Sequence, residues 1–138
     1  MEMITEDYVS FETAKLLKEK GFDEYGFNGY IKYKYVKEFD TYLQTSEYVD
    51  YNFKKYYYPC PTLQMAMKWL REVHNIFIGI SVCERYENKT DLEPIVMFFF
   101  ELLNLKEKQI INGYSQEYVH TYEEACEAAI KYCLENLI

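Results

Sequence analysis

The residues of this chain that could supply a nucleophile, a general base or soft metal ligands are four cysteines and two histidines: Cys60, Cys83, Cys126, Cys133, His74 and His120. The cysteines form no C-x-x-C pair and lack the spacing of a zinc finger. Cys126 and Cys133 fall on one predicted helix at a separation of about 10.5 Å along its axis, too far for a disulfide or a shared tetrahedral metal. The sequence therefore predicts four reduced thiols and no metal site.

A catalytic pair of Cys83 and His74 is the nucleophile arrangement that remains open, because residues distant in sequence can meet in a fold. The alternative is that both histidines are structural. His74 falls in the last turn of a predicted helix, where the helix dipole would favour a protonated imidazole.

Three carboxylates at a predicted helix start could imitate a metal site: Glu123, Glu124 and Glu127. Their positions are explained equally by a capping box between Thr121 and Glu124, by the helix dipole, and by a pair of Glu127 with Lys131. The glycines are scattered, so the clustered backbone N–H groups of a phosphate-binding loop are missing. We predict no catalytic residue and no cofactor, and keep an enzyme of a class without sequence signature as the alternative.

A basic and aromatic stretch, residues 30–37, alternates tyrosines with lysines. Tyr30, Lys32 and Lys34 could contact a single-stranded nucleic acid by stacking and by charge. Lysines on a strand also protect an exposed edge, and tyrosines pack well on sheets, so a structural role is the alternative. The formal net charge of -8 argues against a duplex nucleic acid as a partner.

An aromatic cluster before and within the second predicted helix is typical of protein interfaces, which favour tyrosine, tryptophan and methionine. Its members are Tyr56, Tyr57, Tyr58, Met65 and Trp69. They could equally form a small core beneath the neighbouring ribbon. The leading hypothesis is a non-enzymatic accessory protein that binds another protein or a second copy of itself.

Periodicity and capping residues predict an α+β fold with an antiparallel sheet and three helices, in the order helix, β-ribbon, helix, two to three strands, helix. We expect helices over 11–20, 62–74 and 122–136, a ribbon of strands 30–37 and 47–53 joined by a loop at 41–46, and sheet strands over 76–83, 95–105 and 108–112. Ile76, Ile78, Ile80 and Val82 should share one buried face. The apolar run 95–105 should be a central strand covered on both faces. A parallel βαβ arrangement is the weaker alternative.

The length of 138 residues and the 49% hydrophobic content indicate a single globular domain, residues 1–138. The first residues are acidic and no apolar segment follows them, so no secretory signal is expected. The longest apolar run is too short to span a bilayer. Together with reduced cysteines, these features predict a cytoplasmic location without membrane contact.

Three segments resemble a family of small uncharacterised proteins of gut Bacteroidetes and of their phages or mobile elements: Val9-Ser-Phe-Glu-Thr-Ala-Lys-Leu-Leu-Lys-Glu-Lys-Gly-Phe22, the helix 61–75, and the helix 122–138. The resemblance covers about a third of the chain and implies no activity, cofactor or catalytic residue. The tyrosine-rich segment 25–58 lies outside it.

Overall fold

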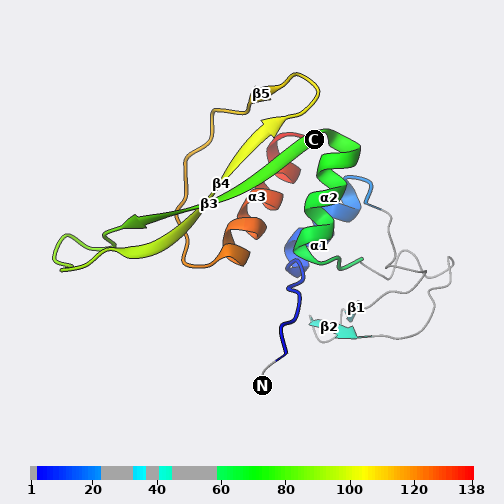
Figure 1. Cartoon of the computed structure of the whole chain (residues 1–138). Helices are drawn as coiled ribbons and strands as arrows, with labels where there is room; N and C mark the ends of the chain where they lie inside the picture. Colours follow the sequence, from blue (N-terminus) through cyan, green and yellow to red (C-terminus); the bar gives the residue numbers. More distant parts are fainter. Residues whose placement is uncertain (1–2, 23–32, 37–40, 45–58) are drawn as a thin grey trace, which may run out of the picture.

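The computed structural model describes residues 3–22, 33–36, 41–44 and 59–138, which form an α+β fold (Figure 1). The described elements are α1 (Phe11–Glu19), β1 (Tyr33–Val36), β2 (Thr41–Gln44), α2 (Leu63–His74), β3 (Ile76–Arg85), β4 (Ile95–Asn104), β5 (Gln109–Ile110) and α3 (Tyr122–Asn136). Strands β3, β4 and β5 form one antiparallel sheet in that order, and β1 pairs with β2 separately. The predicted class and element order are confirmed.

Each helix begins directly after a cap residue whose hydroxyl oxygen accepts an early backbone N–H that has no partner within the helix. The three pairs are Ser10 with the N–H of Thr13 at 3.2 Å, Thr62 with Met65 at 3.2 Å, and Thr121 with Glu124 at 3.1 Å. The carboxylate of Glu124 reaches back to the N–H of His120 at 3.3 Å, one residue before the cap. The capping box therefore also secures the chain that enters α3.

The first two helices end where the backbone turns left-handed. Gly21 has a φ of 97°, and the N–H of Phe22 donates to the carbonyl of Leu17 at 2.8 Å, which is the Schellman geometry. Asn75 ends α2 with a φ of 58°, and Ile76 starts β3 immediately after it. One residue therefore turns the chain from the helix layer into the sheet.

The ribbon is present, but its second strand lies earlier than predicted. Thr41–Gln44 forms β2, with Tyr35 opposite Tyr42, so the loop predicted at 41–46 is wrong over these positions. Threonine and tyrosine at the start of β2 favour a pleated strand, and this preference was outweighed in the prediction by the polar residues that follow. The strand predicted over 47–53 lies outside the described residues.

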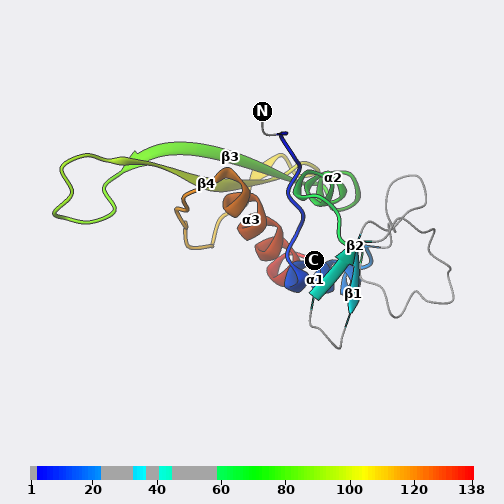
Figure 2. The same cartoon turned by 90° about the horizontal axis from the view of Figure 1, so that it is seen from below.

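The three helices lie on one side of the sheet (Figure 2). The core is formed by α1, α2 and α3 against the first half of β3 and the last half of β4, with Leu17, Leu70, Leu102, Ile130 and Leu134 almost fully buried. Six residues of α3 are buried, including both of its cysteines. The predicted placement of Cys126 and Cys133 on a buried stripe is confirmed.

Two burial predictions are wrong because the β3–β4 hairpin is longer than the helices that cover it. Ile76 and Ile78 are buried, whereas Val82 is 59% exposed on the same face. The run 95–104 is the central strand, as predicted, but in the described part of the chain the helices pack on one of its faces only (Figure 2). The edge of β4 that faces away from β3 is lined by the chain that leads from β5 to α3, through a bridge between Phe98 and Val119.

A tertiary carboxylate joins α1 to α3. Glu127 Oε1 accepts the backbone N–H of Ser10 at 3.1 Å, the Thr13 hydroxyl at 2.6 Å, and the Ser10 hydroxyl. A negative charge at this position also complements the positive end of the α1 dipole. The predicted pair of Glu127 with Lys131 is replaced, since Lys131 Nζ bonds Glu12 at 2.9 Å instead.

We expect Glu127→Ala to lower the free energy of unfolding by about 2 kcal/mol, because it removes charge-assisted hydrogen bonds and leaves Ser10 and Thr13 without their acceptor. Glu135→Ala is the matched control on the same helix, because the one ion pair of Glu135 with a described residue is the exposed pair with Lys131 at 4.0 Å. This substitution should cost less than about 0.5 kcal/mol. Urea unfolding measures both. Equal losses in the two variants would show that the Glu127 contacts do not hold α1.

Candidate functional site: an open sheet face

The register of the sheet sorts its side chains between two faces, because residues directly opposite each other in an antiparallel pair point to the same side. Ile78 opposite Leu102 and Ile80 opposite Phe100 face the helices. On that side the ring of Phe100 stacks on Tyr114 at 5.2 Å and meets Tyr132 of α3 at 6.3 Å. Residues of the opposite parity form the other face, which we call the open face.

The open face carries an apolar row across all three strands. Phe77 of β3 lies opposite Leu103 of β4, which in turn lies opposite Ile110 of β5. Phe77 is 41% exposed and Ile110 is 69% exposed, and Leu105 adds a further exposed side chain beside them. We call Phe77, Leu103, Leu105 and Ile110 the end patch.

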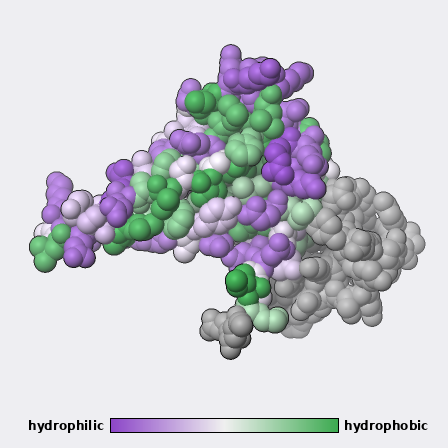
Figure 3. Space-filling view, viewed as in Figure 1, coloured by the Kyte–Doolittle hydropathy of each residue, from purple (hydrophilic) through white to green (hydrophobic). Residues whose placement is uncertain are grey.

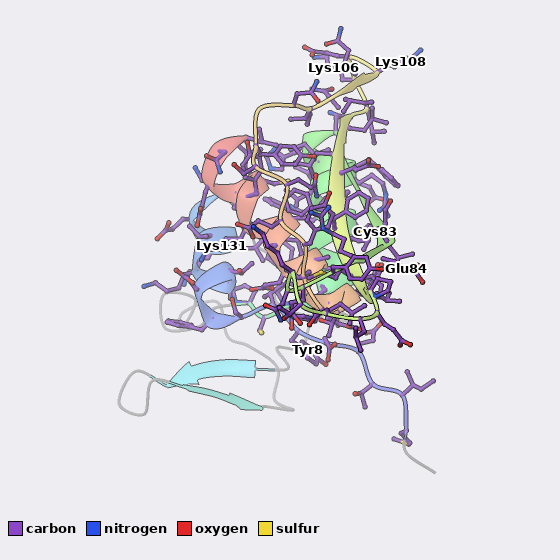
Figure 4. The ribbon with its side chains drawn as sticks, turned by 90° about the vertical axis from the view of Figure 1, so that its left-hand side faces the viewer. Tyr8, Cys83, Glu84, Lys106, Lys108 and Lys131 are labelled. Atoms are coloured by element: carbon purple, nitrogen blue, oxygen red, sulfur yellow. The ribbon has the colours of Figure 1, made fainter. Side chains whose placement is uncertain are left out.

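Charged residues border the end patch. The turn between β4 and β5 carries Lys106, Glu107 and Lys108, and both lysines lie at the extreme end of the molecule (Figure 4). In the space-filling view, apolar atoms lie near this turn beneath hydrophilic ones, and further apolar atoms follow the hairpin (Figure 3). An apolar centre with a polar rim is the usual composition of a protein interface.

The other end of the open face is covered by polar and aromatic contacts. The guanidinium of Arg85 lies 3.9 Å from the centre of the Tyr118 ring, which packs on Phe99 at 5.5 Å. His120 Nε2 lies 3.0 Å from Glu87 Oε1, and this pair joins the β3–β4 loop to the start of α3. These contacts fix the chain after β5 against the hairpin, so the end patch is the apolar part of the open face that remains exposed.

The predicted interface residues of α2 are half-buried. Trp69 packs edge-on against Phe22 at 5.4 Å and against His74 at 4.6 Å, and its ring borders the core. Met65 is also half-buried. Tyr56, Tyr57 and Tyr58 lie outside the described residues, so their joining Met65 and Trp69 in one surface stays a prediction.

The residues predicted for single-strand binding are described only in part. Lys34 lies in β1, with its backbone opposite Leu43. Tyr30 and Lys32 lie outside the described residues. A nucleic-acid surface on this stretch therefore stays a prediction.

Three of the four thiols are held in the protonated form. Burial raises the pKa of Cys60 to about 12, with a further contribution from the charge of Glu127. Burial likewise raises the pKa of Cys126 to about 11 and that of Cys133 to about 12. Because the thiolate is the reactive form, these three cysteines are poor nucleophiles at neutral pH.

The candidate pair of Cys83 and His74 is wrong. His74 lies just before the first residue of β3, whereas Cys83 lies near its far end. Seven residue steps along an extended strand lead from Ile76 to Cys83, a distance of about 23 Å that is far beyond side-chain reach. His74 instead contacts Trp69, and its Nε2 atom is buried without a hydrogen-bond partner among the described residues.

Within the residues that the structure describes, no group of three or more histidine, cysteine, aspartate or glutamate side chains could hold a metal ion. Among the described helices, none combines the length and the hydrophobicity that a bilayer-spanning segment needs.

Comparison with protein-family models, with curated proteins and with solved structures finds no match to this chain. The resemblance of its three helices to the Bacteroidetes family therefore stays a prediction. The open face and its end patch were not predicted from the sequence. The signal was present in β4, whose residues are apolar at both parities, and in Phe77 and Ile110, which align with it across the sheet.

For Trp69 we expect a role mainly in stability. Trp69→Ala should lower the free energy of unfolding by about 2 to 3 kcal/mol, somewhat less than the loss for a fully buried ring. Val73→Ala is the control on the same helix, since Val73 is 57% exposed and should change stability by less than about 0.5 kcal/mol. Equal stability of Trp69→Ala and wild type, with a loss of self-association, would instead assign Trp69 to an interface.

His74 should make stability depend on pH. Desolvation lowers the pKa of His74 below its ordinary value of 6.5, so near and below that pH the unfolded chain binds a proton that the native imidazole does not. The resulting stability is present above about pH 6.5 and is lost as pH falls toward the lowered native pKa. Urea unfolding at about pH 5 and about pH 7.5 should show a smaller pH difference for His74→Gln than for wild type. An unchanged difference would contradict this assignment, as would a larger one.

Proposed function

We propose that the protein is a non-enzymatic accessory protein that acts by binding another protein, and that the end patch is its contact surface. The observation that supports this proposal is the row of Phe77, Leu103 and Ile110, which crosses all three strands with two of its members substantially exposed. Exposed apolar side chains that occur singly need no explanation, whereas a contiguous group of them commonly marks a contact site.

The sheet provides a rigid support for such a contact. Asn104 pairs with Gln109, and the carbonyl of Asn75 accepts the N–H of Leu105 at 2.7 Å, so backbone hydrogen bonds hold both sides of the patch. The turn is further fixed by the side chain of Asn104, which accepts the N–H groups of Lys106 and Glu107 at 3.0 Å each. A preorganised surface loses little conformational entropy when a partner binds.

The chemistry of the described residues also favours binding over catalysis. Three thiols are protonated at neutral pH, and the two histidines make separate contacts at opposite ends of the hairpin. The end patch itself is apolar with lysines at its border, which fits a partner surface of apolar residues with carboxylates around them.

Ile110→Lys should weaken retention of the partner by about tenfold or more, because it places a charge in the centre of the apolar contact. The fold should be unaffected, since Ile110 is 69% exposed in a short edge strand. The measurement is capture from the native cytoplasm by immobilised protein, followed by titration of the captured partner.

Leu92→Lys is the matched control for this experiment. Leu92 is 96% exposed in the loop between β3 and β4, at the other end of the hairpin from the end patch (Figure 1). It should retain the partner as wild type does. Partner loss in both variants, or in neither, would reject the end patch as the contact surface.

A further inference from the structure

The backbone of β3 has one edge that faces away from the sheet. The carbonyl of Leu102 accepts the N–H of Ile111 at 2.8 Å, and Phe98 exchanges two hydrogen bonds with Val119. The backbone N–H and C=O groups of the even-numbered residues of β4 therefore point toward β5. Those of the odd-numbered residues point toward β3. With the register of the β3–β4 pair, this directs the N–H and C=O groups of Ile80, Val82 and Glu84 away from β4.

This edge is exposed along the second half of the strand. Ile78 is 5% exposed, whereas Val82 is 59% exposed and Glu84 is exposed beside it. No described residue forms a hydrogen bond with the backbone of Ile80, Val82 or Glu84 on this side. Both views show this half of the hairpin extending beyond the helices (Figures 1 and 2).

Most features that protect an edge strand are also missing from β3, whose charged residues, Glu84 and Arg85, lie only at its end. Natural proteins block such edges with proline, lysine, a β-bulge or a covering element, because a row of free donors and acceptors pairs readily with another strand. The sequence Ile-Phe-Ile-Gly-Ile-Ser-Val-Cys-Glu-Arg contains no proline and no lysine. Its register with β4 is unbroken over all ten residues.

We propose that a second copy of this chain pairs with this edge, β3 against β3 in antiparallel orientation, with the two-fold axis at Val82. Val82 then lies opposite Val82 of the second copy, and Ile80 lies opposite Glu84 of the second copy on each side of the axis. Each of these opposed residues presents both its N–H and its C=O outward, so every pair exchanges two hydrogen bonds. The result is one continuous sheet of six strands with an isologous interface.

Charge complementarity favours this register. It places Arg85 of the second copy opposite Gly79, which has no side chain, and Gly79 lies opposite Glu101 on the neighbouring strand. The three residues share the open face, with Arg85 and Glu101 two strand spacings apart, about 10 Å between Cα atoms and within combined side-chain reach. To make this contact, the guanidinium of Arg85 leaves the Tyr118 ring that it contacts within its own chain. Glu101 is exposed and forms no ion pair with a described residue. By symmetry the contact forms twice.

Neighbouring registers are less favourable. An axis at Cys83 would place Arg85 of the second copy opposite Ser81, which lies opposite Phe99, so the contact with Glu101 would be lost. An axis at Ile80 would place Glu84 of the second copy against Ile76, which is 4% exposed, and an axis at Ser81 would place it against Ile78, which is 5% exposed. An axis at Glu84 would oppose two carboxylates, which is destabilising. The edge and the end patch are separate surfaces, so this inference does not depend on the proposed function.

Sedimentation equilibrium of the full chain tests the pairing. Wild type should show a concentration-dependent dimer, and Val82→Lys should raise its dissociation constant about tenfold or more by placing two ammonium groups at the axis. Val96→Lys is the matched control, because Val96 is 53% exposed on the same face but one strand away from the edge. It should dimerise as wild type does, and Ile110→Lys should too. Circular dichroism and thermal melts establish that each variant is folded.

A charge exchange tests the register. Arg85→Glu should weaken the dimer, and adding Glu101→Arg should restore it. The single and the double variant both lose the contact between Arg85 and Tyr118, so that loss cannot explain a difference between them. If the wild-type protein stayed monomeric at concentrations up to about 1 mM, the proposal would be overturned. Equal effects of Val82→Lys and Val96→Lys would overturn it too, and failure of the double variant to recover would reject the axis at Val82.

Discussion

The pairing of β3 with β4 is the interaction on which the rest of this structure depends. All ten residues of each strand are paired, so the hairpin is a long, regular support. Its first half forms the floor of the core, where Ile78, Leu102 and Phe100 meet the helices. The hairpin also positions the neighbouring elements. β5 and Val119 pair with the free edge of β4, and Asn75 joins α2 directly to β3.

Lengths explain why half of this hairpin has no covering layer. Ten residues of strand extend over about 33 Å, whereas the fifteen residues of α3 extend over about 22 Å. A helix laid across the floor of the core therefore cannot cover the strands to their ends. The apolar alternation of β3 continues beyond the helix, and Val82 and Val96 are exposed for this reason.

Local signals in the sequence predicted the elements well. Ser10, Thr62 and Thr121 cap the three helices because each hydroxyl satisfies a backbone N–H, and this chemistry depends on neighbouring residues alone. Periodicity likewise placed β3 and β4 within two residues of their observed ends. The buried stripe of α3 was readable for the same reason.

The exposure of the sheet could not be predicted in this way, because it depends on which elements pack together. An apolar run such as 95–104 indicates burial on both faces only if two layers are available to cover it. The contact of Glu127 with Ser10 and Thr13 could not be predicted for the same reason, since it joins residues more than a hundred positions apart. Lys131, four residues after Glu127, offered a local partner that the fold does not use.

Gly79 shows how this fold leaves stability unrealised. Its φ is not among the positive values of the described glycines, so its backbone suits any residue. A Cβ atom added there would lie 3.6 Å from the Phe77 ring, an ordinary contact. Alanine would therefore fit and would remove the entropic disadvantage of glycine in a strand, about 0.5 to 1 kcal/mol. By keeping glycine at this position, the chain leaves open space on the sheet surface and forgoes a small gain in stability.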